Sequence, residues 1–256
     1  MILYGASGHC KVIIDILEAN KIPIDYIVDD NNSLSSLLGY DVKRNSGAYS
    51  EEMIVAIGSC QTRKSIVDAI KVKGYGTAVH PSAIVSPRAT IGCGTVIMQG
   101  AIVQSCASVG KHCIVNTGAS VDHDVLISDF VHIAPHATIT GGVEIGEGTW
   151  IGAGTVIKQG VRIGSWSMIG AGSVVVDDIP SGVVAFGNKC KIYKVNEMIK
   201  DINVAPAFCG ISSTIMTGVK ELGEDCLIGA GAVVIRDVPD KAVVAGVPAK
   251  IIKYKE

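Results

Sequence analysis

The stretch from Val85 to Val175 constrains the fold most, because every sixth residue in it is Ile or Val. Four residues after these aliphatics the side chain is small or β-branched, as at Ala101, Ala119 and Ala137. A hexapeptide period of this kind is the signature of a parallel β-helix. Each hexad then supplies a short strand and a corner, and three hexads close one triangular coil of about eighteen residues whose interior the aliphatics fill.

Residues 1 to about 80 show a different pattern, in which short apolar runs alternate with segments of helical spacing. The expected elements are strands at Ile2–Tyr4, Ile24–Val28, Met53–Ile57 and Thr77–Val79, and helices at about 10–20 and 61–73. Strands that alternate with helices predict a small parallel, Rossmann-like α/β sheet. Ligands of such sheets bind beyond the carboxyl ends of the strands.

Three polar segments fall at those carboxyl ends, namely the turn Gly5–His9, the pair Asp29-Asp30 and the pair Gly58-Ser59. The turn can offer backbone N–H groups and a helix N-terminus to a phosphate, and the aspartates can accept hydrogen bonds from a ribose or a base. For the turn taken alone, a plain strand-to-helix connection without a ligand is the alternative. The turn lacks the full dinucleotide fingerprint, so NAD is not predicted.

His123 lies between Asp122 and Asp124 and precedes no interior position, so its side chain is expected to point outward. A neighbouring carboxylate raises the basicity of an imidazole and fixes its tautomer, which suits a general base near neutral pH. Gly141 follows one coil later, so its backbone is expected to lie over the His123 corner. A solvated corner histidine is the alternative interpretation.

His132 follows half a coil after His123 and precedes the interior Ile133, so it is expected to point outward from a different side of the prism. A single site that uses both imidazoles must therefore span two chains, which predicts a cyclic oligomer and, for a triangular prism, a trimer. A histidine packed at an interface is the alternative for His132. His112 and His136 are expected to be structural.

Composition excludes several function classes. The 256 residues carry a formal net charge of −2 without a basic run, which argues against nucleic-acid binding. The sequence contains no run of roughly 18 apolar residues, so no membrane span is predicted. The N-terminus lacks a signal-peptide pattern and the 8 cysteines form no CxxC pair, so we expect a cytoplasmic protein with reduced thiols.

Taken together, these segments resemble the bacterial sugar acetyltransferases of the sialic acid O-acetyltransferase type, which include N-acetyltransferases of nucleotide-linked 4-amino sugars. The resemblance covers residues 1 to about 190. The matching segments are Gly5–His9, Asp29-Asp30, Ala56–Gly58, Val121–Asp124 and Val131–Pro135. It implies a left-handed β-helix, although the connections between parallel strands are usually right-handed. It also implies a trimer with acetyl-CoA between adjacent prisms and the nucleotide sugar on the N-terminal domain.

The resemblance also implies residue roles. The general base falls on His123, the acid that raises its basicity on Asp124, where some relatives have Glu, and the oxyanion-binding amide on Gly141. A second histidine near the thioester falls on His132. The remaining expected contacts are Ala153 and Ala171 for acetyl-CoA, and Ser7, Gly8, His9, Asp29, Asp30, Gly58 and Asn116 for the nucleotide sugar.

The C-terminal part departs from the family, because its usual ending occurs twice, at about 177–194 and again at about 237–254. Between the two endings the six-residue step returns at Ile228 and Val234, with its register slipped by one residue. We expect a nucleotide-sugar-binding α/β domain at 1–80 and a β-helix acetyltransferase domain at 81–256. An inserted excursion is expected at about 181–212, with a short helix near Val195–Ile202.

The expected function is the transfer of an acetyl group from acetyl-CoA to the amine of a nucleotide-linked amino sugar, in glycan biosynthesis, by a homotrimer without a metal. O-acetylation of a sialic acid or a related sugar is the alternative. A zinc-dependent hydratase on a hexapeptide prism is a rival, but a third histidine one or two coils away from His132 and His136 is missing. A nucleotide-sugar-binding scaffold is the non-enzymatic alternative.

Overall fold

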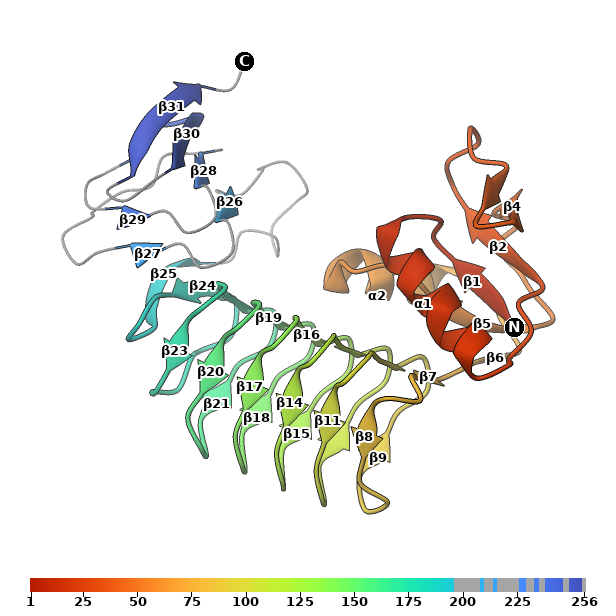
Figure 1. Cartoon of the computed structure of the whole chain (residues 1–256), viewed down its shortest axis with the longest axis horizontal. Helices are drawn as coiled ribbons and strands as arrows, with labels where there is room; N and C mark the ends of the chain where they lie inside the picture. The colour runs from red at the N-terminus through yellow and green to blue at the C-terminus, as the bar shows by residue number, and fades with distance from the viewer. Residues whose placement is uncertain are drawn as a thin grey trace.

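The computed structural model describes residues 1–195 without a break and, beyond them, residues 208–209, 214–215, 226–228, 233–234, 238–245 and 249–254. An N-terminal α/β unit lies beside one end of a long three-walled β-helix, and a smaller β unit carries the C-terminus (Figure 1). Within the described residues, no helix has the length and apolar character needed to cross a membrane.

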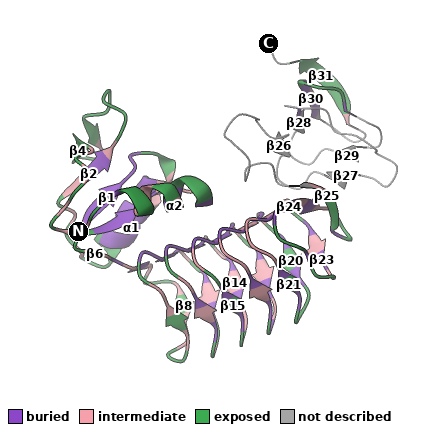
Figure 2. Cartoon of the chain, turned by 180° about the vertical axis from the view of Figure 1, so that it is seen from behind, coloured by how far each residue is buried: buried purple, intermediate pink, exposed green. Residues whose placement is uncertain are grey.

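The N-terminal unit is a six-stranded, mostly parallel sheet in the order β3-β4-β2-β1-β5-β6. Its elements are β1 (Ile2–Tyr4), α1 (Gly8–Ala19), β2 (Tyr26–Asp29), β3 (Ser36–Leu37), β4 (Tyr40–Arg44), β5 (Glu52–Val55), α2 (Cys60–Ala69) and β6 (Gly74–Tyr75). β1 is central and pairs in parallel with β2 and β5, so the carboxyl ends of these three strands meet at one edge. Figure 2 shows the central strand β1 buried, whereas β4 and α2 have much exposed surface.

The sequence prediction of this sheet was wrong at two places. The run Thr77–Val79 was expected among its strands, but Ala78–Val79 forms β7 and pairs with the β-helix. The last parallel strand of the sheet is β6, which pairs with β5. The antiparallel hairpin of β3 and β4 was not expected at all.

The β-helix has three walls, whose strands pair in parallel except for β25. Wall 1 consists of β7 (Ala78–Val79), β10 (Val96–Ile97), β13 (Ile114–Val115), β16 (His132–Ile133), β19 (Trp150–Ile151), β22 (Met168–Ile169), β24 (Val183–Phe186) and β25 (Lys191–Val195). Wall 2 consists of β8 (Ile84–Val85), β11 (Ile102–Val103), β14 (Ser120–Val121), β17 (Thr138–Ile139), β20 (Val156–Ile157) and β23 (Val174–Val175). Wall 3 consists of β9 (Thr90–Ile91), β12 (Ser108–Val109), β15 (Leu126–Ile127), β18 (Glu144–Ile145) and β21 (Arg162–Ile163).

The hexapeptide period is confirmed by this arrangement. The repeated aliphatic is the second residue of each strand from β8 to β23, and most of these side chains belong to one buried core. Neighbouring coils pair in parallel at matched positions, for example Ile97 with Val115. Because the side chains of a strand alternate between its faces, the first residue of each strand points out of the prism.

The corners explain two of the histidines. One residue of most corners has a positive φ, and at several corners it is a glycine. His112 and His136 occupy this left-handed position, and their rings lie over Gly94 and Gly118 of the preceding coil, where a Cβ would collide with the imidazole. Both histidines therefore fill space at corners.

The N-terminal unit packs on the first coils of wall 1. The outward side chains Val96 and Ile114 of that wall are buried in the same cluster as Ile13 and Leu17 of α1. At the end of α1, the Asn20 amide donates a hydrogen bond of 2.8 Å to a wall 1 carbonyl. This packing fixes the carboxyl edge of the small sheet next to the prism.

The repeated ending folds the same way twice. β24 pairs in parallel with β22 and then forms an antiparallel hairpin with β25. The remaining strands are β26 (Phe208–Cys209), β27 (Thr214–Ile215), β28 (Leu227–Ile228), β29 (Val233–Val234), β30 (Ala242–Ala245) and β31 (Lys250–Tyr254). β30 repeats the arrangement with β28 and β31, and both hairpins have a register shift at the same place. Most of the expected helix near Val195–Ile202 lies outside the described residues.

Candidate active site

His123 lies at the corner between β14 and β15, on the edge where walls 2 and 3 meet. Its side chain is 54% exposed, and its Nδ1 lies 2.8 Å from Asp124 Oδ2. Because a carboxylate only accepts, Nδ1 carries the proton in the neutral ring and Nε2 keeps its lone pair. The hydrogen bond to Asp124, and next the charge of Asp122, raise the pKa of His123 above its ordinary value.

The next coil places the backbone of Gly141, a buried residue, beside the imidazole. Asp124 takes the left-handed position with φ +58°, so His123 lies one residue earlier and projects outward. A Cβ on Gly141 would lie 2.6 Å from His123 Cε1 and 2.7 Å from Nε2. Among the described residues, none accepts a hydrogen bond from the Gly141 N–H, whereas the N–H of Gly142 donates to the His123 carbonyl at 3.0 Å.

The glycine turn at the carboxyl edge of β1 is held by a carboxylate. Asp29 Oδ2 accepts from the Ala6 N–H at 2.6 Å, and its Oδ1 accepts from the Asn31 N–H at 2.7 Å. Ser7 and Gly8 are exposed at the start of α1, where the Ser7 side chain makes no capping hydrogen bond. Asp29 therefore supports the turn, and the exposed amides at the start of α1 can meet a ligand.

A hydrogen-bonded network holds Asp30 at the same edge. The Tyr4 hydroxyl donates to Asp30 Oδ2 at 2.8 Å, and the Asn45 amide donates to Oδ1 at 3.0 Å. The Tyr49 hydroxyl donates to Asn45 Oδ1 at 2.7 Å. Burial, and then the bond to Asp30, raise the pKa of Tyr4. Tyr4 and Asn45 were missed by the sequence analysis, because only the pairing of β2 with β1 and with β4 brings them to Asp30.

His132 lies in β16 of wall 1, under the loop that follows β5. It is 5% exposed, with Nδ1 3.1 Å from the Gly58 carbonyl and Nε2 3.1 Å from Asn116 Nδ2. Since a carbonyl only accepts, Nδ1 carries the proton; Asn116 Oδ1 accepts from the Thr117 N–H, which turns its NH₂ group toward Nε2. Burial, and then the charge of Arg63, lower the pKa of His132 to about 3.

The same cluster contains His9. Its ring centroid lies 6.5 Å from that of His132, and the Trp150 ring centroid lies 4.1 Å from that of His132. Burial, and then the charge of Arg63, lower the pKa of His9 to about 4. His9 Nε2 is buried and has no hydrogen-bond partner among the described residues. The predicted residues His9, Gly58 and His132 thus meet at the junction of the N-terminal unit and wall 1.

His123, His132 and the pair Ala153 and Ala171 do not meet within one chain. The prediction that His123 and His132 lie on different sides of the prism is confirmed, since His132 is on wall 1 and His123 is on the edge between walls 2 and 3. Ala153 and Ala171 lie on the remaining edge between walls 1 and 2, stacked through a hydrogen bond from the Gly172 N–H to the Ala153 carbonyl at 2.8 Å.

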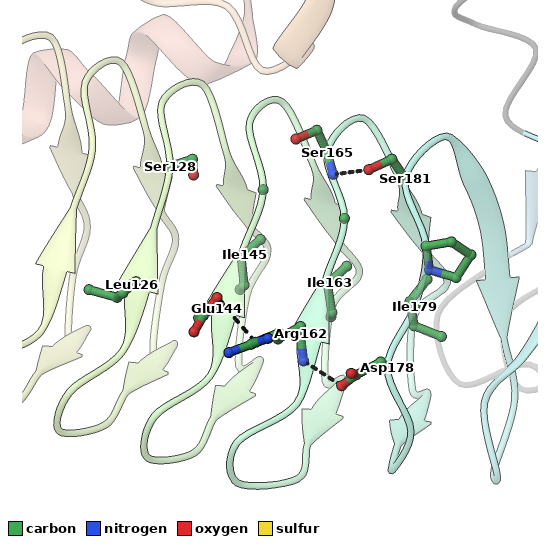
Figure 3. Close-up of a pocket in the computed structure, with 13 residues that line it drawn as sticks. Leu126, Ser128, Glu144, Ile145, Arg162, Ile163, Ser165, Asp178, Ile179 and Ser181 are labelled. Atoms are coloured by element: carbon green, nitrogen blue, oxygen red, sulfur yellow. Dashed lines mark hydrogen bonds and ion pairs between the residues drawn. The ribbon is translucent and has the colours of Figure 1, made fainter.

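A groove of about 660 Å³ lies elsewhere, on wall 3 and the corners that follow it (Figure 3). Arg162 reaches across it to Glu144, with Nε 3.3 Å from Oε2, and its backbone N–H donates to Asp178 at 2.8 Å. None of the residues predicted for the site lines this groove. Over the part of the chain that the structure describes, no three His, Cys, Asp or Glu side chains are grouped to hold a metal ion.

Comparison with known proteins decides the family. The PglD N-terminal domain model matches residues 1–70, and the bacterial transferase hexapeptide model (six repeats) matches residues 142–177. The acetyltransferase domain of PglB from Neisseria gonorrhoeae is 36% identical, with 75% of this chain and 98% of that chain covered and a TM-score of 0.69. The chain belongs to the PglD-like family of hexapeptide-repeat sugar acetyltransferases.

A second similar solved structure is that of a mutant of perosamine N-acetyltransferase from Caulobacter crescentus in complex with CoA and GDP-perosamine. It is 32% identical, with 75% of this chain and 95% of that chain covered and a TM-score of 0.69. A curated relative, 2,3,4,5-tetrahydropyridine-2,6-dicarboxylate N-acetyltransferase from Enterococcus faecalis, is 52% identical over 44 residues. That match spans 17% of this chain and 18% of the relative.

Proposed function

We propose that this protein transfers the acetyl group of acetyl-CoA to the amine of a nucleotide-linked amino sugar. The observation that carries the proposal is the exposed His123–Asp124 pair beside the Gly141 N–H that no described residue engages. Acyl transfer needs these two functions together, a base with a free lone pair and a donor for an oxyanion. The solved perosamine N-acetyltransferase, which binds CoA and GDP-perosamine, adds support for the substrate class.

The proposed reaction is direct transfer between the two substrates. The sugar amine attacks the thioester carbonyl carbon, and its proton moves to His123 Nε2 as the new C–N bond forms. The Gly141 N–H donates to the oxyanion of the tetrahedral intermediate. The C–S bond then breaks, and the imidazolium returns the proton to the departing CoA thiolate. Asp124 stabilises the imidazolium in between through its bond to Nδ1.

We further propose that the working unit is a homotrimer. Within one chain, His123 and the pair Ala153 and Ala171 lie on different edges of the prism. An acetyl-CoA molecule that contacts those alanines can meet His123 only from an adjacent chain. His132, an expected contact near the thioester, is covered by the N-terminal unit of its own chain, and that role stays part of the proposal.

The N-terminal unit is proposed to hold the nucleotide part of the substrate. The exposed Ser7 and Gly8, the Asp30 network and Gly58 share the carboxyl edge of the parallel strands, where such sheets bind ligands. We propose residues 1–80 as this domain, with β7 at its end as the first strand of wall 1, and residues 81–256 as the transferase domain. We also propose a cytoplasmic location, and an excursion at about 181–212 whose described part, β24 and β25, continues wall 1.

The test is an assay of thiol release from acetyl-CoA with a panel of UDP-, GDP- and dTDP-linked amino sugars, and with sialic acid. Mass spectrometry and hydroxylamine treatment separate an amide product from an ester. We expect an amide on one amino sugar, unchanged by EDTA. An ester product would make the protein an O-acetyltransferase, and activity lost with a removed metal would favour a metal-dependent enzyme. If calorimetry showed that CoA does not bind, the protein would be a nucleotide-sugar-binding scaffold and not an acetyltransferase.

A further inference from the structure

Arg63 of α2 is the most buried charged side chain described, with 1% exposure. Its Nε donates to the His112 carbonyl at 2.7 Å, and its Nη2 donates to the Phe130 carbonyl at 2.8 Å. Its Nη1 donates to the carbonyls of Ile57 and Gly58 at 2.8 and 2.9 Å. One guanidinium therefore ties the loop after β5 to two successive corners between walls 3 and 1.

The charge of this guanidinium has no carboxylate beside it. Among the described residues, no Asp or Glu forms an ion pair with Arg63. The neighbouring Cys60 is buried, and this burial raises the pKa of its thiol, so it stays protonated. An unpaired buried charge is costly even when it is hydrogen-bonded, and an apolar side chain fills such a space at lower cost. Packing alone therefore does not explain an arginine here.

The Gly58 carbonyl links Arg63 to the imidazole of wall 1. It accepts from Arg63 Nη1 at 2.9 Å and from His132 Nδ1 at 3.1 Å. The Nδ1 proton keeps the Nε2 lone pair directed at Asn116 Nδ2, 3.1 Å away. If the Gly58 carbonyl turned away, His132 would lose the acceptor that selects its tautomer.

We propose that Arg63 is a positioning residue, whose four hydrogen bonds fix the Gly58 loop on the prism and thereby hold His132 in the Nδ1–H tautomer toward Asn116. Because Gly58 lies at the proposed nucleotide-sugar edge, Arg63 sets the place of the sugar site relative to the prism. The substrate part of this inference rests on the proposed function, whereas the tautomer part does not.

Lysine is not an adequate substitute for Arg63. The guanidinium has donors in three directions within one plane, and it uses them on three separate backbone segments. An ammonium group keeps the charge but is a compact point that cannot span those segments. Arg63→Lys therefore separates the effect of charge from the effect of the hydrogen-bonded fork.

The first test is NMR of the protein labelled with ¹⁵N-histidine, with the His132 signal assigned from His132→Gln. We expect one Nδ1–H tautomer that does not titrate between pH 5 and 8 in the unmodified protein. Among the described residues, the titratable and charged groups next to His132 are His9, Arg63 and the Cys60 thiol. In Arg63→Met we expect both tautomers or a titrating signal, and Arg63→Lys should behave likewise. A single, non-titrating Nδ1–H signal in both variants would contradict the proposal.

Lys64→Met is the matched control, because Lys64 is the next residue of α2 and also carries a positive charge. It pairs with Asp68 at 3.4 Å and Glu147 at 3.6 Å, away from the Gly58 carbonyl. Its His132 signal should equal that of the unmodified protein. A change of the same size in the control would mean that any loosening of α2 disturbs His132, and the role of the fork would be rejected.

The second test is steady-state kinetics with the amino sugar identified in the assay above. Arg63→Met should raise KM for the nucleotide sugar about 10-fold or more, with KM for acetyl-CoA and kcat changed less than about threefold. If both KM values rose and kcat fell by similar factors, together with a lower thermal midpoint, Arg63 would only stabilise the fold. If the protein acetylates none of the sugars, the proposed function fails while the NMR result still decides the tautomer claim.

Discussion

Two histidines of the same β-helix show how surroundings divide one side chain between two tasks. At His123 the Nδ1 proton faces a carboxylate, the ring is exposed, and the pKa is raised. At His132 the Nδ1 proton faces a carbonyl, the ring is buried near a guanidinium, and the pKa is lowered to about 3. The same tautomer is fixed at both places, but only His123 can take up a proton near neutral pH.

The neighbours of Nε2 sharpen this contrast. At His123 the lone pair lies beside the Gly141 backbone and no described side chain occupies it. At His132 the lone pair already accepts from Asn116. A proton released in the reaction can therefore bind to His123 Nε2 but not to His132 Nε2. Substitutions at these positions test this division, and the largest loss of turnover is expected at His123.

Replacing His123 with Ala should lower kcat by about 10²-fold or more, which is the usual contribution of a general base. The side chain is exposed, so the thermal midpoint should change little. The measurement is turnover with both substrates saturating, and His80→Ala, at the first coil, is the control. Near-normal turnover of the His123 variant would contradict the role of His123 as the general base.

Replacing Gly141 with Ala should lower kcat by roughly 10-fold, because the new Cβ would lie 2.6 Å from the His123 ring and displace the general base. The ring is exposed and can move, so stability should hold. Gly146→Ala is the matched control, since its Cβ would collide with the Ser165 backbone nitrogen, and that backbone cannot move away cheaply. The control should lose thermal stability. The opposite pattern, with Gly141→Ala unstable and active, would contradict the proposed site.

Replacing Asp124 with Asn should lower kcat severalfold and move the acidic limb of the pH profile to lower pH. The bond to Asp124 is the main cause of the raised pKa of His123, so its loss lowers that pKa. A general base must be neutral, and activity falls as pH drops through its pKa. The profile of kcat/KM between about pH 5 and 9 measures the shift. If the acidic limb did not move, it would report the titration of a group other than His123.

The sequence was sufficient for the prism and for its outward corner. A period of six assigns each residue to a wall, an edge or the interior, so the exposure of His123 and its stacking with Gly141 could be predicted. The carboxylate was adjacent in the chain and therefore visible. The position of His132 on a different side of the prism followed from the same count.

The burial of His132 could not be read from the repeat. It depends on how the N-terminal unit packs on wall 1, through contacts such as Arg63 with Phe130 that join residues 67 positions apart. Arg63 has no motif around it, and one arginine in a short amphipathic helix is usually a surface residue. β7 was misplaced for a related reason, since a two-residue apolar strand fits either sheet until its partner is known.

Replacing His132 with Gln should have the smallest effect on turnover among these variants and should change the pH dependence of stability. The folded pKa of about 3 lies below the unfolded value of about 6.5, so the unfolded chain binds the proton first. His132 therefore makes stability fall as pH drops below about 6.5.

Without His132, the free energy of unfolding should be lower at pH 7 by about 1–3 kcal/mol, since the Gly58 carbonyl and Asn116 lose their partner. Its decline toward pH 4 should be shallower, by up to about 1.4 kcal/mol per pH unit. Urea titrations at pH 7, 6, 5 and 4 and one protein concentration measure both effects. His123→Ala is the comparison, because that imidazole has a raised pKa and its loss cannot flatten the acid limb. Parallel curves for His132→Gln and the unmodified protein would mean that the wall 1 imidazole takes up protons in the folded state.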